Sequence, residues 1–90
     1  MYFVYILVCL ESGRTYVGQT DNLIRRFRLH REGSTRTTRE RLLAPVVIHW
    51  EAFGTRTEAI QRERFFKAGV GHRRKCELVR TELKAWFGLG

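Results

Sequence analysis

The first nine or ten positions of the chain are almost entirely aromatic, β-branched or aliphatic, a pattern that indicates a strand. This strand is predicted to run from Tyr2 to Leu10. The polar stretch Glu11–Arg14 then predicts a turn, and Thr15–Gly18 predicts the returning strand of a hairpin. The chain is therefore expected to open with two antiparallel strands.

The length of the turn decides which side chains of this hairpin share a face. A two-residue turn would place Tyr16 opposite Cys9. Because side chains alternate between the two faces of a strand, Tyr16 would then lie on the same face as Tyr5 and Leu7. A different turn length could break that parity, so the prediction is conditional on the turn.

A helix is predicted directly after the hairpin. Thr20 or Asp21 can cap its first turn, and helical spacing continues to about His30 or Arg31. Its buried stripe is predicted to consist of Leu23, Ile24 and Phe27.

The second half of the chain predicts one more strand and two more helices. Val46–Phe53 is expected to be a central or otherwise paired strand, with Trp50 as a core or edge anchor. Thr55–Glu58 has the spacing of a capping box, and a helix should follow to about Ala68, where glycines end it. A last helix is predicted for Arg73–Phe87, and its apolar contacts should be Leu78, Leu83, Trp86 and Phe87.

Together these elements predict one α+β domain over residues 1–90. It should contain a three-stranded antiparallel sheet, made of the N-terminal hairpin and a third strand, flanked by about three helices. Ninety residues leave room for a single core.

Charge and composition narrow the class of partner. The net charge of +8 predicts attraction to polyanions, with nucleic acid as the first candidate. No apolar run approaches the roughly 20 residues that span a membrane, and the apolar N-terminus lacks the basic leader of a signal peptide. Cys9 and Cys76 lack the spacing of a zinc site, which favours a reducing cytoplasm as the location.

One charged residue conflicts with the apolar pattern of its helix. Glu63 lies at helical spacing from Ala59 and Phe66, in the middle of a stripe that should be buried. An unpaired buried carboxylate costs several kcal/mol, so Glu63 must have a partner. Two partners remain open: Arg26 in a structural ion pair, or a divalent cation such as Mg²⁺.

Three further residues are candidates for a site: Tyr16, Arg26 and His30. Tyr16 is either an ordinary strand aromatic or a base, and a base would need nearby cations because a free phenol has a pKa of about 10. Gly18 would leave room for a phosphate near it. Arg26 lies on the border of the buried stripe, from which its fork could reach over the hairpin and bind a phosphate. His30 is either a helix-surface or C-terminal capping residue, or a part of the same site.

The order of these residues resembles the GIY-YIG nucleases, which include a nuclease domain of bacterial excision repair and some homing endonucleases. The two family triplets correspond to Phe3-Val4-Tyr5 and Tyr16-Val17-Gly18, and Arg26 and Glu63 follow at matching places. The departures are apolar exchanges within strands, except that the first glycine of the family is replaced by Phe3.

The resemblance implies a metal-dependent endonuclease that nicks DNA, with RNA not excluded, in DNA repair or processing. It implies that Tyr16 is the general base or a hydrogen-bonding partner of the attacking water, and that Arg26 stabilises the transition state. Glu63 would hold a single Mg²⁺ or Mn²⁺, Tyr5 would orient the phosphate or the water, and His30 would make a secondary contact. The resemblance also leaves room for a partner protein that selects the substrate.

Other classes compete with this interpretation. The arginines of Gly33–Arg41 predict a loop that grips phosphates, which would also suit a nucleic-acid-binding module without catalysis. A basic protein of the membrane surface would need long apolar helix faces beside lysines, whereas the basic residues here are mostly arginines within a folded core.

Overall fold

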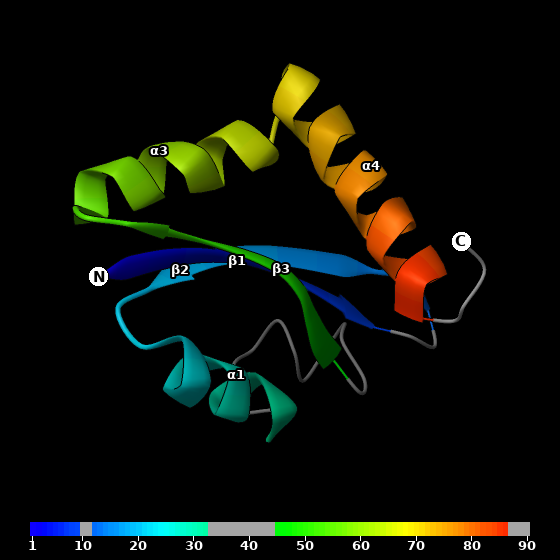
Figure 1. Ribbon diagram of the computed structural model, residues 1–90, viewed down its shortest axis with the longest axis horizontal. Coiled ribbons are helices and arrows are strands. Elements are labelled where there is room, and N and C mark those ends of the chain that lie inside the picture. Colours follow the sequence, from blue (N-terminus) through cyan, green and yellow to red (C-terminus); the bar gives the residue numbers. More distant parts are fainter. Residues whose placement is uncertain (10–11, 33–44, 87–90) are drawn as a thin grey trace.

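The computed structural model describes residues 1–9, 12–32 and 45–86 of the chain. Figure 1 shows a sheet that is covered by helices on both of its faces. The predicted α+β fold with a three-stranded antiparallel sheet and three helices is confirmed. In chain order the elements are β1 (Tyr2–Cys9), β2 (Thr15–Thr20), α1 (Leu23–Arg31), β3 (Pro45–Phe53), α3 (Arg56–Phe66) and α4 (Gly69–Trp86).

Strand β1 is the middle of the sheet, and the strand order is β2-β1-β3. Its even-numbered side chains, Val4, Ile6 and Val8, pack under α3 and α4. Its odd-numbered side chains, among them Tyr5 and Leu7, pack against α1. Both faces of β1 are therefore covered, which explains why its sequence is an apolar run rather than an alternating pattern. The third strand is paired as predicted, but it lies at an edge.

The hairpin register differs from the one that a two-residue turn would produce. Tyr16 lies opposite Leu7 rather than Cys9. The connection is longer than two residues, and it is closed by hydrogen bonds from the Cys9 amide to the Arg14 carbonyl and from the Gly13 amide to the Cys9 carbonyl. The new partner of Tyr16 lies on the same face as the old one, so Tyr5 and Tyr16 share a face as expected.

The helix starts follow capping chemistry. Helix α1 is capped by Asn22, not by Thr20 or Asp21: the Asn22 side chain accepts a hydrogen bond from the Arg25 amide at 3.0 Å. Thr55 caps α3 as predicted and accepts from the Glu58 amide at 3.2 Å. Substitution of such a cap typically costs about 1 kcal/mol.

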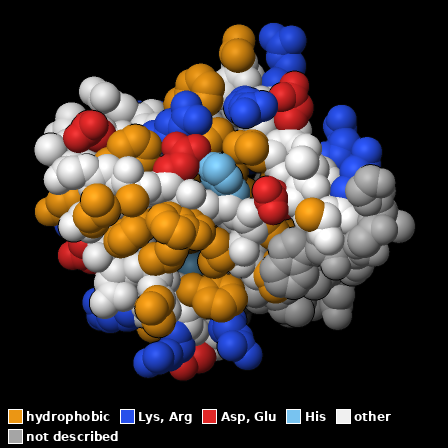
Figure 2. Space-filling view, viewed as in Figure 1, with side chains coloured by type: hydrophobic (Ala, Val, Ile, Leu, Met, Phe, Trp, Pro, Cys, Tyr) orange, Lys and Arg blue, Asp and Glu red, His pale blue; other side chains and the backbone are white. Residues whose placement is uncertain are grey.

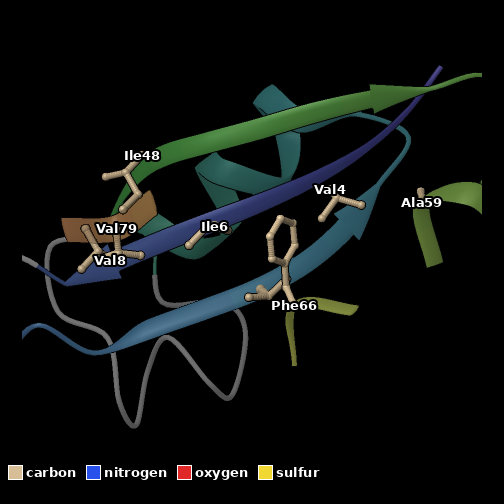
Figure 3. Close-up of a cluster of buried hydrophobic side chains, with 8 residues drawn as sticks. Val4, Ile6, Val8, Ile48, Ala59, Phe66 and Val79 are labelled. Atoms are coloured by element: carbon tan, nitrogen blue, oxygen red, sulfur yellow. The ribbon is translucent and has the colours of Figure 1, made fainter. Parts of the chain in front are cut away.

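The main core lies between the sheet and the two helices α3 and α4 (Figure 3). Phe66 and Ala59 come from α3, and Val79 comes from α4; all three are buried. Burial of a side chain such as Phe66 contributes roughly 1.5–3 kcal/mol. Leu78 and Leu83 pack at the margin of this core, as predicted for the last helix.

Trp50, expected as a core or edge anchor, lies on an edge strand and is exposed, and Ile24, predicted to be buried, is exposed as well. Trp50 is 55% exposed, and its ring meets Phe3 edge-on at a centroid distance of 5.9 Å. Ile24 is 75% exposed, because α1 turns Leu23 and Phe27 toward the sheet instead. Figure 2 shows hydrophobic side chains gathered near the middle of one face, with basic side chains above and below them.

Some predictions concern residues outside the described part of the chain. They are the phosphate-gripping loop Gly33–Arg41, the contact of Phe87 and the side-chain contact of Trp86. None of the helices that the structure describes combines the length and apolar character needed to cross a membrane.

Helix α4 begins at Gly69, earlier than predicted, and Gly71 lies within its first turns. A Cβ atom at Gly71 would collide with the carbonyl oxygen of Phe65 at the end of α3. We therefore expect Gly71→Ala to lower the free energy of unfolding by about 2 kcal/mol or more, because backbone must move. Urea denaturation followed by circular dichroism measures the change.

The matched control is Gly54→Ala, since a Cβ atom at Gly54 meets nothing within 4 Å. It should change the free energy of unfolding by less than about 1 kcal/mol. Equal effects of the two substitutions would show that the close contact between α3 and α4 does not require glycine.

Candidate active site

The buried hydroxyl of Tyr5 joins two side chains of α1. Arg26 Nε donates a hydrogen bond to the Tyr5 hydroxyl oxygen at 3.3 Å, and His30 Nε2 lies 2.9 Å from the same oxygen. A guanidinium can only donate, so the Tyr5 oxygen accepts from Arg26. The Tyr5 O–H is then free to donate to His30, which assigns the neutral tautomer with its proton on Nδ1.

Burial sets the protonation states in this network. It raises the pKa of Tyr5 well above its usual value, although the hydrogen bond from Arg26 opposes the change. Burial, together with the Arg26 charge, lowers the pKa of His30 to about 4. The hydrogen bond to Tyr5 raises the pKa of Arg26. At neutral pH the network therefore consists of a phenol, a neutral imidazole and a guanidinium.

Tyr16 packs against this network from the edge strand β2. Its ring centroid lies 4.8 Å from that of His30 and 6.1 Å from that of Tyr5. A Cβ atom at Gly18 would lie 2.5 Å from the Tyr5 hydroxyl oxygen and 2.9 Å from Tyr16 Cε1. The space above Gly18, predicted to admit a phosphate, is thus filled by the two tyrosines, and glycine is needed there for their approach.

The structure corrects the interpretation of His30 as a surface or capping residue. Its side chain is 1% exposed and belongs to the same cluster as the two tyrosines. The sequence offered one indication, because His30 lies four positions after Arg26 and so on the same side of the helix.

Arg26 is half-buried and borders open space. A cleft of about 220 Å³ is lined by Arg25 and Arg26 of α1 and by Thr20 at the end of β2. Arg25 and Arg28 are exposed on the solvent side of the helix. The exposed carboxylate of Asp21 also lines the cleft. An anionic group there would meet this one carboxylate and two guanidinium groups, one of which is already oriented by Tyr5.

Helix α3, which carries Glu63, is fixed against β3 by an ion pair. Arg62 Nε donates to Glu51 at 2.8 Å, and His49 Nε2 lies 2.8 Å from the same carboxylate. The Arg62 guanidinium also lies over the Phe66 ring, 4.5 Å from its centroid. These contacts limit rotation of α3 about its axis and so set the direction of Glu63.

Glu63 is neither fully buried nor bound to Arg26. Its side chain is 22% exposed and accepts a hydrogen bond from Lys67 Nζ at 2.8 Å. The predicted pair with Arg26 is wrong, because the Arg26 guanidinium bonds to Tyr5. Lys67 was missed as the partner, although its position four residues after Glu63 is the usual spacing of a helical ion pair.

The predicted site residues thus fall into two groups. Tyr5, Tyr16, Arg26 and His30 form one contact cluster on the α1 face of the sheet. Glu63 lies on α3, which covers the opposite face and contacts β2 and β1 (Figure 1). An active site that used both groups would extend around the edge of the sheet that β2 forms.

The donor set limits how a metal ion could bind. Within residues 1–9, 12–32 and 45–86, no three His, Cys, Asp or Glu side chains stand together as ligands. Mg²⁺ is often held by one or two carboxylates and completed by water and phosphate oxygens. Glu63 fits such a site as its single protein ligand, provided that it exchanges Lys67 for the ion.

The structure is thus a small α+β domain with tyrosines on two paired strands and an arginine and a histidine on the next helix. The family model of the GIY-YIG catalytic domain matches residues 1–75. The chain therefore belongs to the GIY-YIG family.

Several Bacillus proteins are similar to this chain. A UPF0213 protein of Bacillus licheniformis is 40% identical over 68 residues, which cover 73% of this chain and 67% of that protein. A UPF0213 protein of Bacillus pumilus is 33% identical over 84 residues, 92% of this chain and 82% of the relative. The solution NMR structure of a UPF0213 protein from Bacillus halodurans matches at 32% identity with a TM-score of 0.52, over 90% of this chain and 85% of that one. These names state no substrate.

The lowered pKa of His30 predicts a pH-dependent stability. Between pH 6.5 and about 4 the unfolded chain binds a proton at His30 that the folded chain does not. The stability linked to His30 is therefore complete above pH 6.5 and is lost as the pH falls toward 4, by up to about 3 kcal/mol. Urea denaturation across this pH range measures the loss.

In the variant His30→Gln much of this pH dependence should disappear, because glutamine does not titrate. His72→Gln, exposed on α4, is the matched control and should keep the pH dependence of the parent. If the free energy of unfolding changes with pH in the same way in the parent and in His30→Gln, His30 is not a buried neutral imidazole.

Proposed function

We propose that this protein is a metal-dependent endonuclease that hydrolyses phosphodiester bonds in DNA, with RNA not excluded, one strand at a time. The observation that supports this most directly is the Arg26 guanidinium held by the buried Tyr5 hydroxyl beside an open cleft. Membership of the GIY-YIG family supports the same class of reaction.

Arg26 is proposed to bind the phosphate that is attacked. Its bond to Tyr5 uses Nε, so a phosphate would approach the two terminal nitrogens, close to the Tyr16 hydroxyl that also interacts with this guanidinium. Because the guanidinium is oriented before the substrate arrives, it can stabilise the growing negative charge without reorganisation. Tyr5 and His30 would act through Arg26 by keeping it in place.

Tyr16 is proposed to orient the attacking water. Its ring is wedged against His30 and Tyr5, which limits where its hydroxyl can point. The water adds to phosphorus as the bond to the leaving oxygen breaks. Tyr16 accepts a hydrogen bond from the water, whose proton passes through Tyr16 to solvent, and the leaving oxygen takes a proton from solvent.

Glu63 is proposed to hold one Mg²⁺ or Mn²⁺ in exchange for Lys67. Such an ion supplies charge neutralisation at the phosphate and lowers the pKa of a bound water. A single metal and a single cluster suit the cleavage of one strand in each event.

A second candidate function is a nucleic-acid-binding module without catalysis. It is favoured by one observation, the engagement of Glu63 by Lys67 in a layer separate from the Arg26 cluster. In that case Glu63 would be a structural ion-pair partner and would bind no metal.

Cleavage of supercoiled, single-stranded, flapped and branched DNA, and of RNA, with Mg²⁺ or Mn²⁺ tests the proposal. We expect Arg26→Ala to lower the rate by about 100-fold or more, as loss of a transition-state donor does elsewhere. Glu63→Gln should abolish the stimulation of cleavage by Mg²⁺ or Mn²⁺. Tyr16→Phe should slow cleavage by at least about tenfold.

Arg28→Ala is the matched control, because Arg28 is exposed on the same helix and outside the cluster. It should cut within a few-fold of the parent. Nucleic-acid binding without cleavage of any substrate would favour the module, and equal cleavage by all variants would remove the assigned roles.

A further inference from the structure

A second cavity lies away from the Arg26 cleft. It has a volume of about 900 Å³ and lies between the tip of the β1–β2 hairpin and α4. Four basic side chains line it: Arg14 from the hairpin, Lys67 just after α3, and Lys75 and Arg80 from α4. None of its described lining residues is acidic, so the cavity is a concave region of positive potential.

The cavity is formed by fixed contacts rather than by loose surface chains. Lys75 Nζ donates a hydrogen bond to Thr15 Oγ1 at 2.9 Å, which ties α4 to β2 across the cavity. Its floor includes the buried side chains of Val17 and Val79. Arg14 and Arg80 are exposed at its margins and have no described acidic partner.

The cavity borders the candidate active site at two residues. Tyr16 lines the cavity, and its ring also contacts His30 in the cluster below the sheet. Lys67 lines the cavity, and its ammonium group also holds Glu63. Because β2 is an edge strand, an extended chain can pass its edge from the cavity to Arg26 without crossing the sheet.

We propose that this cavity binds the sugar–phosphate backbone of the nucleic acid next to the bond that is cut. The proposal rests on the proposed function and extends it to a second contact site. Several cations spread over the lining of one cavity suit repeated phosphates along an extended polyanion better than one small anion. Contacts of this kind position a strand and do not select its sequence.

Cys76 provides a direct test because it lines the cavity and is exposed, whereas the other cysteine, Cys9, is buried. A photo-crosslinker attached to Cys76 should form a covalent bond with labelled DNA in the presence of a chelator, which prevents cleavage. The control carries Cys76→Ser and Thr57→Cys, since Thr57 is exposed and outside the cavity. Equal crosslinking from both positions would overturn the proposal.

Salt-dependent binding gives an independent measure. Arg80→Ala and Lys75→Ala should each reduce the slope of log affinity against log salt by about one, with a similar loss on every sequence. Arg73→Ala is the matched control, because Arg73 is exposed on α4 but does not line the cavity. A loss of slope no larger than that of Arg73→Ala would overturn the proposal.

The two proposals fail separately. If the parent cuts DNA and the Arg80→Ala variant binds DNA as tightly as the parent does, the nuclease proposal stands and the cavity proposal is wrong. If the parent never cuts, but Arg80→Ala weakens binding and Arg73→Ala does not, the nuclease proposal is wrong and the cavity is the binding site of a non-catalytic module. If the protein binds anionic phospholipid vesicles through the same residues and does not bind nucleic acid, both proposals are wrong.

Discussion

The hydrogen bonds of the Tyr5 hydroxyl connect the fold to the candidate chemistry. A buried phenol needs its partners, because an unsatisfied hydroxyl costs about 1–3 kcal/mol. Both partners, Arg26 and His30, come from α1. The same two hydrogen bonds therefore hold α1 against β1 and fix the direction of the Arg26 guanidinium. A protonated imidazole could not accept from Tyr5, and the neutrality of His30 is therefore part of the same constraint.

The central position of β1 divides the molecule into two layers. One layer carries the cluster around Arg26, and the other carries Glu63, the main core and the basic cavity. The edge strand β2 takes part in both layers, since the Tyr16 ring contacts His30 in one and also lines the basic cavity of the other. Chemistry that uses both layers is therefore organised around an edge rather than within a pocket.

The sequence predicted most of the fold because local rules and burial agreed along the chain. The continuous apolar run gave β1, and the capping box gave the start of α3. The shared face of Tyr5 and Tyr16 survived a change of register only because the change preserved parity. The exposure of Trp50 was not predictable in this way, since it depends on which helix covers which part of the sheet. The Lys67 partner of Glu63, by contrast, has the local four-residue spacing of a helical ion pair.

Gly18 shows how a residue without a side chain can determine a site. It has no side chain with which to make a contact, yet the Tyr5 hydroxyl and the Tyr16 ring occupy the volume that its missing Cβ leaves open. Mutagenesis that removes side chains one at a time would pass over such a position, because nothing is there to remove. Only substitutions that add a side chain would reveal its role. By that test the glycine of the Tyr-Val-Gly triplet is as much a part of the cluster as Tyr16 is.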